Sequence, residues 1–307
     1  MSQTLEGRVV IVTGAGRGLG GAHALYLASQ GASVLVNDLG GDVHGEGADL
    51  TAAQRVAAEI ERRGGRAAVS GHDVSSWEQA RQMVTQAVDT FGQLDVLVNN
   101  AGILRDRTLA NMSEAEWDAV LRVHLKGHAA PTSHALAYWR DRAKGGHEVK
   151  ASVIHTTSVA AFAGSLGQAN YSAAKAAVLA LSRVVSLEAG RYGVRSNAVS
   201  PSARTRITTG IEDDGPAPEG FDEMDPANVS PLIGWLAERD CPADSQIFHL
   251  SGGRIIVLSM PPIVHEVKTE GRWTRDALAR ELPGRLVKPA TLEVYLGRPP
   301  IFTAGPA

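Results

Sequence analysis

The chain has 307 residues, 44% of them hydrophobic, and its 30 basic and 33 acidic residues give a net charge of −3. This length and hydrophobic content are sufficient for one large α/β core. The near-neutral charge gives no electrostatic reason to expect nucleic acid or an anionic membrane as a partner. A single cysteine, Cys241, excludes an internal disulfide bond and a cysteine-based zinc site.

The two chain ends carry no recognisable targeting signal. The first residues, M-S-Q-T-L-E-G, lack the charged and apolar regions of a signal peptide, and the last three, G-P-A, are not a peroxisomal address. No apolar run approaches the ~20 residues that a membrane span needs. A soluble, cytoplasmic protein is therefore expected.

A glycine-rich loop opens the chain. The apolar strand Val9 to Val12 runs into T-G-A-G-R-G-L-G and then into a helical pattern, which is the context of a dinucleotide site. Gly14 permits the tight turn, Gly18 lets the backbone approach a pyrophosphate, and Gly20 lets the helix pack closely on the sheet. A glycine-rich hairpin is the alternative. The residues predicted to bind phosphate here are Gly14, Arg17, Gly18, Leu19 and Gly20.

A second strand, Ser33 to Asn37, ends in Asp38. An acidic residue some twenty positions beyond the glycine loop hydrogen-bonds the adenosine ribose. Its carboxylate repels a 2′-phosphate, so NAD is favoured over NADP as the cofactor. Arg17 could contact such a phosphate and keeps NADP open, and Asp38 could alternatively cap a helix.

The next elements alternate between helix and strand. Asp73 and Val74 follow the third strand, at a strand end where an adenine ring could lie. The elements predicted before the fourth strand are a polar glycine-rich loop at 40–47, a helix at 49–63, a strand at 67–71 and a helix at 77–91 capped by Ser75 or Ser76.

A fourth strand, 94–98, ends in N-N-A-G at 99–102. Short amides followed by a glycine suit a wall beside a cofactor ribose, and an ordinary turn is the alternative. We expect Asn100, Ala101 and Gly102 to bind the cofactor. The alternation of strands and helices predicts a single-domain, doubly wound, Rossmann-like parallel sheet of about seven strands, with helices on both faces and ligands at the carboxyl ends of the strands.

The stretch from Ser158 to Lys175 holds the candidate catalytic residues. Tyr171 and Lys175 are four residues apart in an alanine-rich run, so both should leave the same helical face. A cation one turn from a phenol is expected to lower the pKa of Tyr171 from about 10 towards the range of a general base. Ser158 follows a β-branched strand at 153–157 and could hold the substrate oxygen. An exposed helical pair without a catalytic role is the alternative.

His124 and His128 have the spacing of metal ligands on one helical face, but no carboxylate or cysteine accompanies them, so no metal site is expected.

The acidic segment 203–227, rich in Gly and Pro, predicts a mobile substrate lid. The remaining predicted elements are helical segments at 113–125 and 125–142, a helix at 171–192, a strand at 195–199, a helix at 230–238, a seventh strand at 246–250 and a short helix at 274–281.

Beyond Gly253 the sequence is irregular and charged, and its role is not readable. We therefore expect a dinucleotide-binding domain at 1–258, which includes the lid, and a C-terminal extension at 259–307. The alanines of the Tyr171 helix could let helices of two subunits pack closely, so a homodimer or homotetramer is expected. These alanines are at positions 173, 174, 176, 177 and 180.

Together these motifs resemble the short-chain dehydrogenase/reductase family over about residues 7–258. A narrower resemblance is to the (3R)-hydroxyacyl-CoA dehydrogenase unit of peroxisomal multifunctional enzymes, also called 17β-hydroxysteroid dehydrogenase type 4. It rests on N-D-L-G-G-D at 37–42, N-N-A-G-I-L-R-D-R at 99–107, V-H-L-K-G at 123–127 and G-Q-A-N-Y-S-A-A-K at 167–175.

The resemblance also assigns site residues. The wider family has an asparagine at the position of His124, which completes a catalytic tetrad with a water relay to lysine, whereas the narrower group has histidine there. A proton relay through His124 therefore stays open. The proline-glycine that follows the sixth strand in the family is Pro201-Ser202 here, and Thr205 matches a position that contacts the nicotinamide amide. The implied catalytic residues are Ser158, Tyr171, Lys175 and His124.

The expected reaction is the NAD-dependent oxidation of a secondary alcohol to a ketone. Tyr171 would remove the hydroxyl proton, Ser158 would hydrogen-bond the same oxygen, and Lys175 would hold the nicotinamide ribose. The resemblance suggests a (3R)-hydroxyacyl-CoA or a hydroxysteroid as substrate, including a sterol side-chain CoA thioester. The alternatives are a 3-oxoacyl carrier-protein reductase that uses NADPH and a non-catalytic, NAD-binding regulatory protein.

Overall fold

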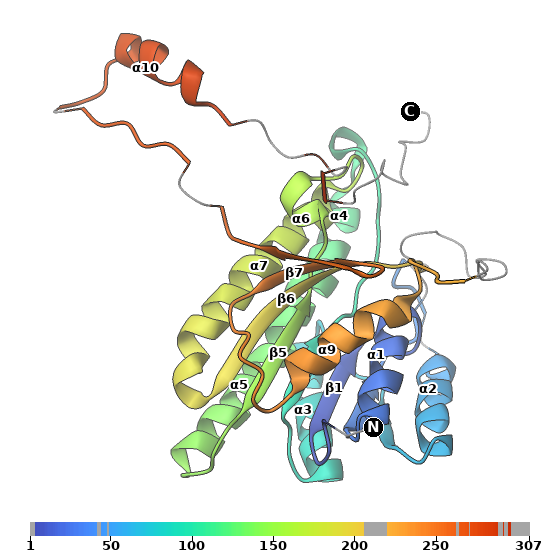
Figure 1. The fold of residues 1–307 in the computed structure, drawn as a ribbon. Coiled ribbons are helices and arrows are strands. Elements are labelled where there is room, and N and C mark those ends of the chain that lie inside the picture. The colour runs from blue at the N-terminus through green and yellow to red at the C-terminus, as the bar shows by residue number, and fades with distance from the viewer. Residues whose placement is uncertain are drawn as a thin grey trace.

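An eight-stranded sheet organises the part of the chain that the computed structural model describes (Figure 1). The described residues are 4–41, 44–47, 49–205, 220–261, 264–269, 271–287, 291 and 294–295. The strands are β1 (Val9–Thr13), β2 (Ser33–Asn37), β3 (Arg66–Ser70), β4 (Val96–Asn99), β5 (Ala151–Thr156), β6 (Val194–Ser202), β7 (Ile247–Ser251) and β8 (Arg254–Leu258). Their order is β3-β2-β1-β4-β5-β6-β7-β8. The predicted doubly wound, Rossmann-like sheet is confirmed.

The last strand corrects the prediction of an irregular chain beyond Gly253. β8 pairs with β7 in an antiparallel register that sets Ser251 opposite Arg254, whereas the other neighbouring strands are parallel. Gly252 has a φ of +54°, a conformation that glycine adopts without strain and that a two-residue hairpin turn requires. The R-I-I-V-L run is therefore an edge strand of the sheet.

Helices cover both faces of the sheet. On one face lie α1 (Gly18–Ser29), α2 (Thr51–Arg62) and α9 (Ser230–Ala237), and on the other α3 (Trp77–Phe91), α5 (Gly127–Lys144) and α7 (Ala169–Ala189). The shorter helices are α4 (Glu114–Leu121), α6 (Ala160–Ala163) and α10 (Arg275–Glu281), and the 3-10 turns are η1 (Leu109–Asn111), η3 (Gly190–Tyr192), η4 (Pro226–Val229) and η5 (Pro283–Arg285).

The central strands are apolar along their length because helices bury both of their faces. Val10 and Val12 of β1 pack beneath α1, α2 and α9, whereas Ile11 packs beneath α3, α5 and α7. Trp139 of α5 is 1% exposed, and its indole N–H donates to the carbonyl of Leu94 at 2.7 Å. This core fixes the carboxyl ends of the strands, where the candidate site lies.

Sequence signals located the helix starts well, but they missed one interruption. Ser76 caps α3, as predicted, by accepting a hydrogen bond from the backbone N–H of Gln79. Between α4 and α5 the chain forms a π-helical turn, η2 (Arg122–Lys126), where two helical segments were expected to follow each other directly. Such turns add a residue locally and often stand at functional sites. Here it directs His124 into the interior.

The predicted lid is only partly described, because residues 206–219 lie outside the described part of the chain. The residues that flank the lid are held together: Arg204 forms an ion pair with Asp222 at 2.9 Å, and its backbone N–H donates to the carbonyl of Met224 at 2.6 Å.

The predicted helix at 274–281 is confirmed as α10, which Figure 1 shows apart from the sheet. No helix among the described residues is long and apolar enough to cross a membrane.

Candidate active site

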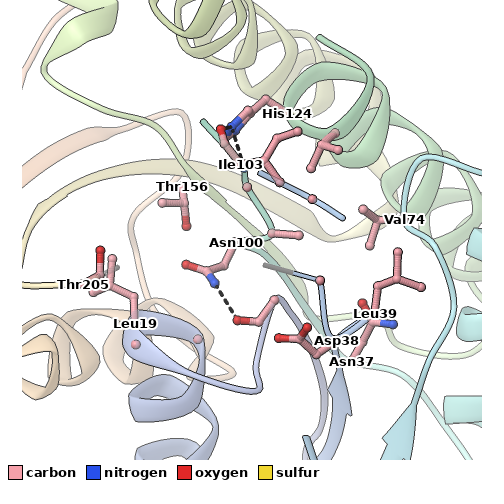
Figure 2. A pocket seen from close by; sticks show the side chains of 18 of the residues that line it. Leu19, Asn37, Asp38, Leu39, Val74, Asn100, Ile103, His124, Thr156 and Thr205 are labelled. Carbon is pink, nitrogen blue, oxygen red and sulfur yellow. Dashed lines mark hydrogen bonds between the residues drawn. The ribbon is translucent and has the colours of Figure 1, made fainter. Parts of the chain in front are cut away.

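A pocket opens at the carboxyl ends of the strands, where the strand order reverses between β1 and β4 (Figure 2). In open α/β sheets, ligands bind at such a reversal point. Every site residue predicted from the sequence lines this one pocket, although the residues come from eight separate segments. They are Gly14, Arg17, Gly18, Leu19, Gly20, Asp38, Asp73, Val74, Asn100, Ala101, Gly102, His124, Ser158, Tyr171, Lys175, Pro201 and Thr205.

The glycine loop leaves room that larger residues would fill. Gly14 has a φ of +63°, and a Cβ added to it would lie 2.8 Å from the Cα of Ala101. A Cβ on Gly20 would lie 2.1 Å from the carbonyl oxygen of Gly14. The side chain of Asn100 donates to that oxygen at 3.2 Å, as Figure 2 shows. This tight turn at the start of α1 fits the pyrophosphate of a dinucleotide.

A threonine that the sequence did not single out joins the two strand ends. The backbone N–H groups of Asn100 and Ala101 donate to Oγ1 of Thr13 at 2.9 and 3.1 Å. The Thr13 hydroxyl donates in turn to the carbonyl of Val98 at 3.3 Å. The loops after β1 and β4 therefore keep a fixed separation across the pocket.

Asp38 is held rigidly at the end of β2. One carboxylate oxygen accepts the backbone N–H of Gly16 at 2.7 Å and the other accepts that of Gly40 at 2.7 Å. Each oxygen keeps a second lone pair for a ligand hydroxyl. A fixed carboxylate in this place fits a ribose that presents two hydroxyl groups.

Ser158, Tyr171 and Lys175 meet on the other wall of the pocket. Tyr171 lies in the first turn of α7, with its ring centre 5.7 Å from Nζ of Lys175. Ser158 lies close enough to the Tyr171 phenol to affect its pKa. Lys175, 2% exposed, donates from Nζ to the carbonyl of Thr156 at 2.6 Å. This arrangement can hold a hydroxyl oxygen and move its proton.

The expected lowering of the Tyr171 pKa is wrong for the protein groups by themselves. The pKa of Tyr171 is raised to about 12, chiefly because burial disfavours the phenolate; Ser158 lowers this pKa by less, and the charge of Asp106 adds a smaller rise. Burial also lowers the pKa of Lys175 to about 7, because an ammonium loses its hydration there. The same desolvation therefore disfavours the Tyr171 phenolate and also lowers the charged fraction of Lys175, the cation that was expected to stabilise the phenolate.

A model of the short chain dehydrogenase family matches residues 8–214, which contain the glycine loop, Ser158, Tyr171 and Lys175. The chain belongs to the short-chain dehydrogenase family. It is an oxidoreductase that acts on hydroxyl groups.

Two curated relatives in this family carry informative names. The hydroxyacyl-CoA dehydrogenase ChsB1 of Mycobacterium tuberculosis is 39% identical over 284 residues, covering 91% of this chain and 88% of the relative. The peroxisomal multifunctional enzyme type 2 of Mus musculus is 41% identical over 251 residues, covering 81% of this chain. The aligned part is only 32% of the mouse protein, so the chain spans about a third of that relative.

Solved short-chain dehydrogenases have the same architecture. A short-chain dehydrogenase from Mycobacterium avium is 46% identical, with a TM-score of 0.85 over 94% of this chain and 98% of the other. The full-length peroxisomal multifunctional enzyme type 2 from Drosophila melanogaster is 28% identical, with a TM-score of 0.69 over 89% of this chain and 44% of the other.

His124 of this short-chain dehydrogenase packs against the candidate base. Its ring meets that of Tyr171 edge to face, with centres 5.1 Å apart, and its Nε2 lies 2.8 Å from the carbonyl oxygen of Ile103 (Figure 2). A Cβ on Gly102 would lie 2.5 Å from the imidazole, so that position requires glycine. Burial and the Lys175 charge hold the pKa of His124 well below 6.5. A neutral His124 therefore shapes the wall of the pocket, and its part in a proton relay stays a prediction.

Sequence reasoning missed several lining residues of the short-chain dehydrogenase pocket. Ile103 and Thr156 carry no motif of their own, and Thr156 contributes only its backbone carbonyl to Lys175.

A pair of buried histidines outside the pocket also had no sequence signal. His128 and His155 form a stacked, fully buried pair whose Nδ1 atoms are 3.3 Å apart. Their partnership joins α5 to β5, and no local pattern could have indicated it.

Proposed function

We propose that the protein is an NAD-dependent dehydrogenase that oxidises the secondary hydroxyl of a (3R)-hydroxyacyl-CoA or of a hydroxysteroid. The observation that carries this proposal is the placement of Ser158, Tyr171 and Lys175 in the same pocket as the glycine loop and Asp38. The name of the mycobacterial relative, a hydroxyacyl-CoA dehydrogenase, supports the substrate class. A sterol side-chain CoA thioester combines both substrate types.

Each residue of the catalytic wall has one task in this mechanism. Ser158 donates a hydrogen bond to the substrate oxygen, and Tyr171 as phenolate takes the hydroxyl proton. Lys175, anchored on Thr156, places a cation one turn from the phenol and holds the nicotinamide ribose. NAD, when bound, supplies the hydride acceptor and a positively charged ring.

Asp38 supports NAD as the cofactor. Because its carboxylate is locked by Gly16 and Gly40, it cannot swing away from a 2′-phosphate. A phosphate next to a fixed carboxylate would be repelled, whereas a ribose hydroxyl can donate to it. Arg17 also lines the pocket and favours the second candidate, an NADPH-dependent 3-oxoacyl carrier-protein reductase.

We expect Asp38→Asn to lower the ratio of kcat/KM with NAD to that with NADP by about 10- to 100-fold, because the neutral amide no longer repels a phosphate. Steady-state rates with the two cofactors measure this ratio. Asp89→Asn, which removes the same charge from an exposed site on α3, should leave it unchanged. A wild-type enzyme that prefers NADP would contradict the NAD assignment.

A substrate screen tests the proposed function itself. The purified protein is offered (3R)-hydroxyacyl-CoA thioesters and steroid alcohols with NAD, while NADH absorbance is followed. Turnover of a CoA thioester or a steroid supports the proposal. Thermal stabilisation by NAD without turnover of any alcohol would support a non-catalytic, NAD-binding regulatory protein instead.

We also propose that the protein forms a homodimer or homotetramer through α7. Ala173, Ala176 and Ala180 are exposed on one face of that helix, which Val184 and Leu187 extend. Ala174, in contrast, is 1% exposed and packs within its own chain, so it is not available to a partner. Small side chains along one face allow two helices to approach closely.

Ala176→Arg is expected to convert the oligomer to a monomer, because a long cation on this face prevents close helix packing. Light scattering gives the mass of the wild type and of the variant. Ala58→Arg, on the exposed side of α2, is the matched control and should keep the wild-type mass. A monomeric wild type would rule out the assembly.

A further inference from the structure

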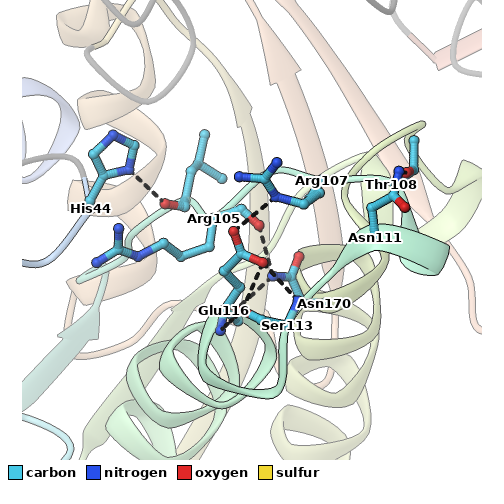
Figure 3. Close-up of polar contacts among 9 residues, drawn as sticks. His44, Arg105, Arg107, Thr108, Asn111, Ser113, Glu116 and Asn170 are labelled. Atoms are coloured by element: carbon cyan, nitrogen blue, oxygen red, sulfur yellow. Dashed lines mark hydrogen bonds and ion pairs between the residues drawn. The ribbon is translucent and has the colours of Figure 1, made fainter. Parts of the chain in front are cut away.

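The first turn of α7, which carries Tyr171, is held by polar contacts with the loop after β4. The backbone N–H of Arg107 donates to the carbonyl of Gly167 at 2.7 Å, and the side chain of Asn170 donates to the carbonyl of Arg105 at 3.0 Å (Figure 3). Asn170 is fully buried, and its Oδ1 accepts the backbone N–H of Tyr171 at 2.7 Å. The position of Tyr171 is therefore fixed by the loop after β4 and by α7 itself.

Ser158 is held differently, by the short helix α6 that follows it. The backbone N–H of Ala160 donates to Oγ of Ser158 at 3.2 Å, and the backbone N–H of Ala161 donates to the Ser158 carbonyl at 3.0 Å. Because an N–H donor occupies one lone pair of the hydroxyl oxygen, the hydroxyl proton points elsewhere. Ser158 lines the pocket, so this proton is available to a substrate oxygen. The direction of the Ser158 hydroxyl therefore depends on the position of α6.

Phe162 attaches α6 to the rest of the fold. Its side chain packs against a small apolar cluster that contains Leu179 of α7 and Ile247 of β7, and Leu258 of β8 packs against the same cluster. Phe162 is only partly buried, so part of its surface stays open to a further contact.

The C-terminal extension makes such a contact. The ring centre of Tyr295 lies 5.7 Å from that of Phe162, and the two rings are tilted by 33°. The guanidinium of Arg254, at the start of β8, donates to the carbonyl of Tyr295 at 3.5 Å. Figure 1 shows the last described part of the chain, in dark red, beside α6, although α10 extends away from the sheet. The end of the chain thus packs on the helix that orients Ser158.

We propose that Tyr295 is a positioning residue for the dehydrogenase reaction: its ring holds α6 through Phe162, and α6 in turn directs the Ser158 hydroxyl at the substrate oxygen. The inference rests on the proposed function, because it gives the C-terminal extension a part in the same site. Aromatic pairs at this separation stabilise their arrangement by a modest amount, so a moderate effect on the rate is expected. Cofactor affinity should not depend on α6, because the glycine loop and Asp38 follow β1 and β2.

Tyr295→Ala is expected to lower kcat for alcohol oxidation by about 3- to 10-fold, while the Kd for NADH changes by less than about 2-fold. Tyr295→Phe keeps the ring and should retain the wild-type kcat. Trp273→Ala removes an aromatic side chain from the same extension, next to α10, and is the matched control that should leave kcat unchanged. An equal loss of kcat in Trp273→Ala would show that the contact with Phe162 is not the cause.

A double-mutant cycle tests whether Tyr295 acts through Ser158. Ser158→Ala has no hydroxyl to direct, so adding Tyr295→Ala to it should lower kcat by less than about 1.5-fold further. The positioning role is wrong if the two substitutions multiply their separate effects, or if Tyr295→Ala alone leaves kcat unchanged.

Hydrogen exchange followed by mass spectrometry separates this inference from the proposed function, because it needs no turnover. The backbone N–H groups of Ala163 and Gly164 donate to carbonyls at the start of α6. In Tyr295→Ala they should exchange about 3- to 10-fold faster than in the wild type, whereas the amides of α3 should keep their rates. Unchanged exchange in α6 would overturn the role of Tyr295. A wild type that oxidises no alcohol would instead overturn the proposed function, and the exchange rates would still decide whether Tyr295 holds α6.

Discussion

Tyr171→Phe is expected to lower kcat for alcohol oxidation by about 10³-fold or more, while the Kd for NADH changes by less than about 3-fold. The substitution removes only the oxygen that takes the substrate proton. The ring, which packs against His124 with centres 5.1 Å apart, is retained. Steady-state kinetics and a fluorescence titration of NADH measure the two quantities.

Tyr192→Phe provides the matched control for this experiment. Tyr192 lies in η3, outside the pocket, and its ring stacks beneath Arg191. Loss of its hydroxyl should leave kcat within about 2-fold of the wild type. Ser158→Ala should fall between the two, because Tyr171 keeps its own hydroxyl. Turnover that survives in Tyr171→Phe would contradict the assignment of the base.

Acid unfolding between about pH 6 and 5 is the second large effect that we expect, because several histidines are buried in the neutral form. Burial lowers the pKa of His23 and of His155 to about 3 from 6.5. Burial and the charge of Lys175 also hold the pKa of His124 and of His128 well below 6.5. All four side chains are at most 1% exposed.

The sign follows from proton uptake. Below pH 6.5 the unfolded chain binds protons on these histidines and the folded chain does not, so the free energy of unfolding falls as the pH falls. From pH 7 to pH 5, His23 and His155 together remove about 4 kcal/mol, a large part of a typical stability of 5–15 kcal/mol. His124 and His128 act in the same direction. Carboxylates contribute only at lower pH.

Circular dichroism against pH, with urea titrations at pH 7 and pH 5.5, measures this loss. His23→Gln keeps a polar group for Ser230, which His23 contacts at 2.9 Å, and should move the acid transition to lower pH. His147→Gln changes an exposed histidine and should leave the curve unchanged. A protein that keeps its full stability at pH 4 would show that the buried histidines are protonated in the fold.

Local signals in the sequence were sufficient for most of the architecture. The buried strands are continuous apolar runs, Ser76 marks the start of α3, and the glycines after β1 predict the turn at which α1 begins. The spacing of Tyr171 and Lys175 placed both on one face of a helix, and they line one pocket. Each of these features depends on residues close together in the chain, so periodicity and turn chemistry are enough to predict them.

The π-helical turn at η2 and the contact between Asp106 and Gln168 had no such signal. Asp106 meets Gln168, 62 positions away in the chain, only because β4 and α7 converge at the same edge of the sheet. The direction of the Tyr171 pKa shift was also beyond local reasoning. A cation one turn away was visible in the sequence, but the desolvation that outweighs it was not.

The sequence by itself determined the sheet, the nucleotide-binding loop and the identity of the hydroxyl, phenol and amine that line the pocket, because short-range backbone preferences and side-chain chemistry set these. Only the tertiary structure decided how acidic those groups are and which histidines are buried away from water. Those properties depend on solvent exclusion by segments that meet only when the chain is folded.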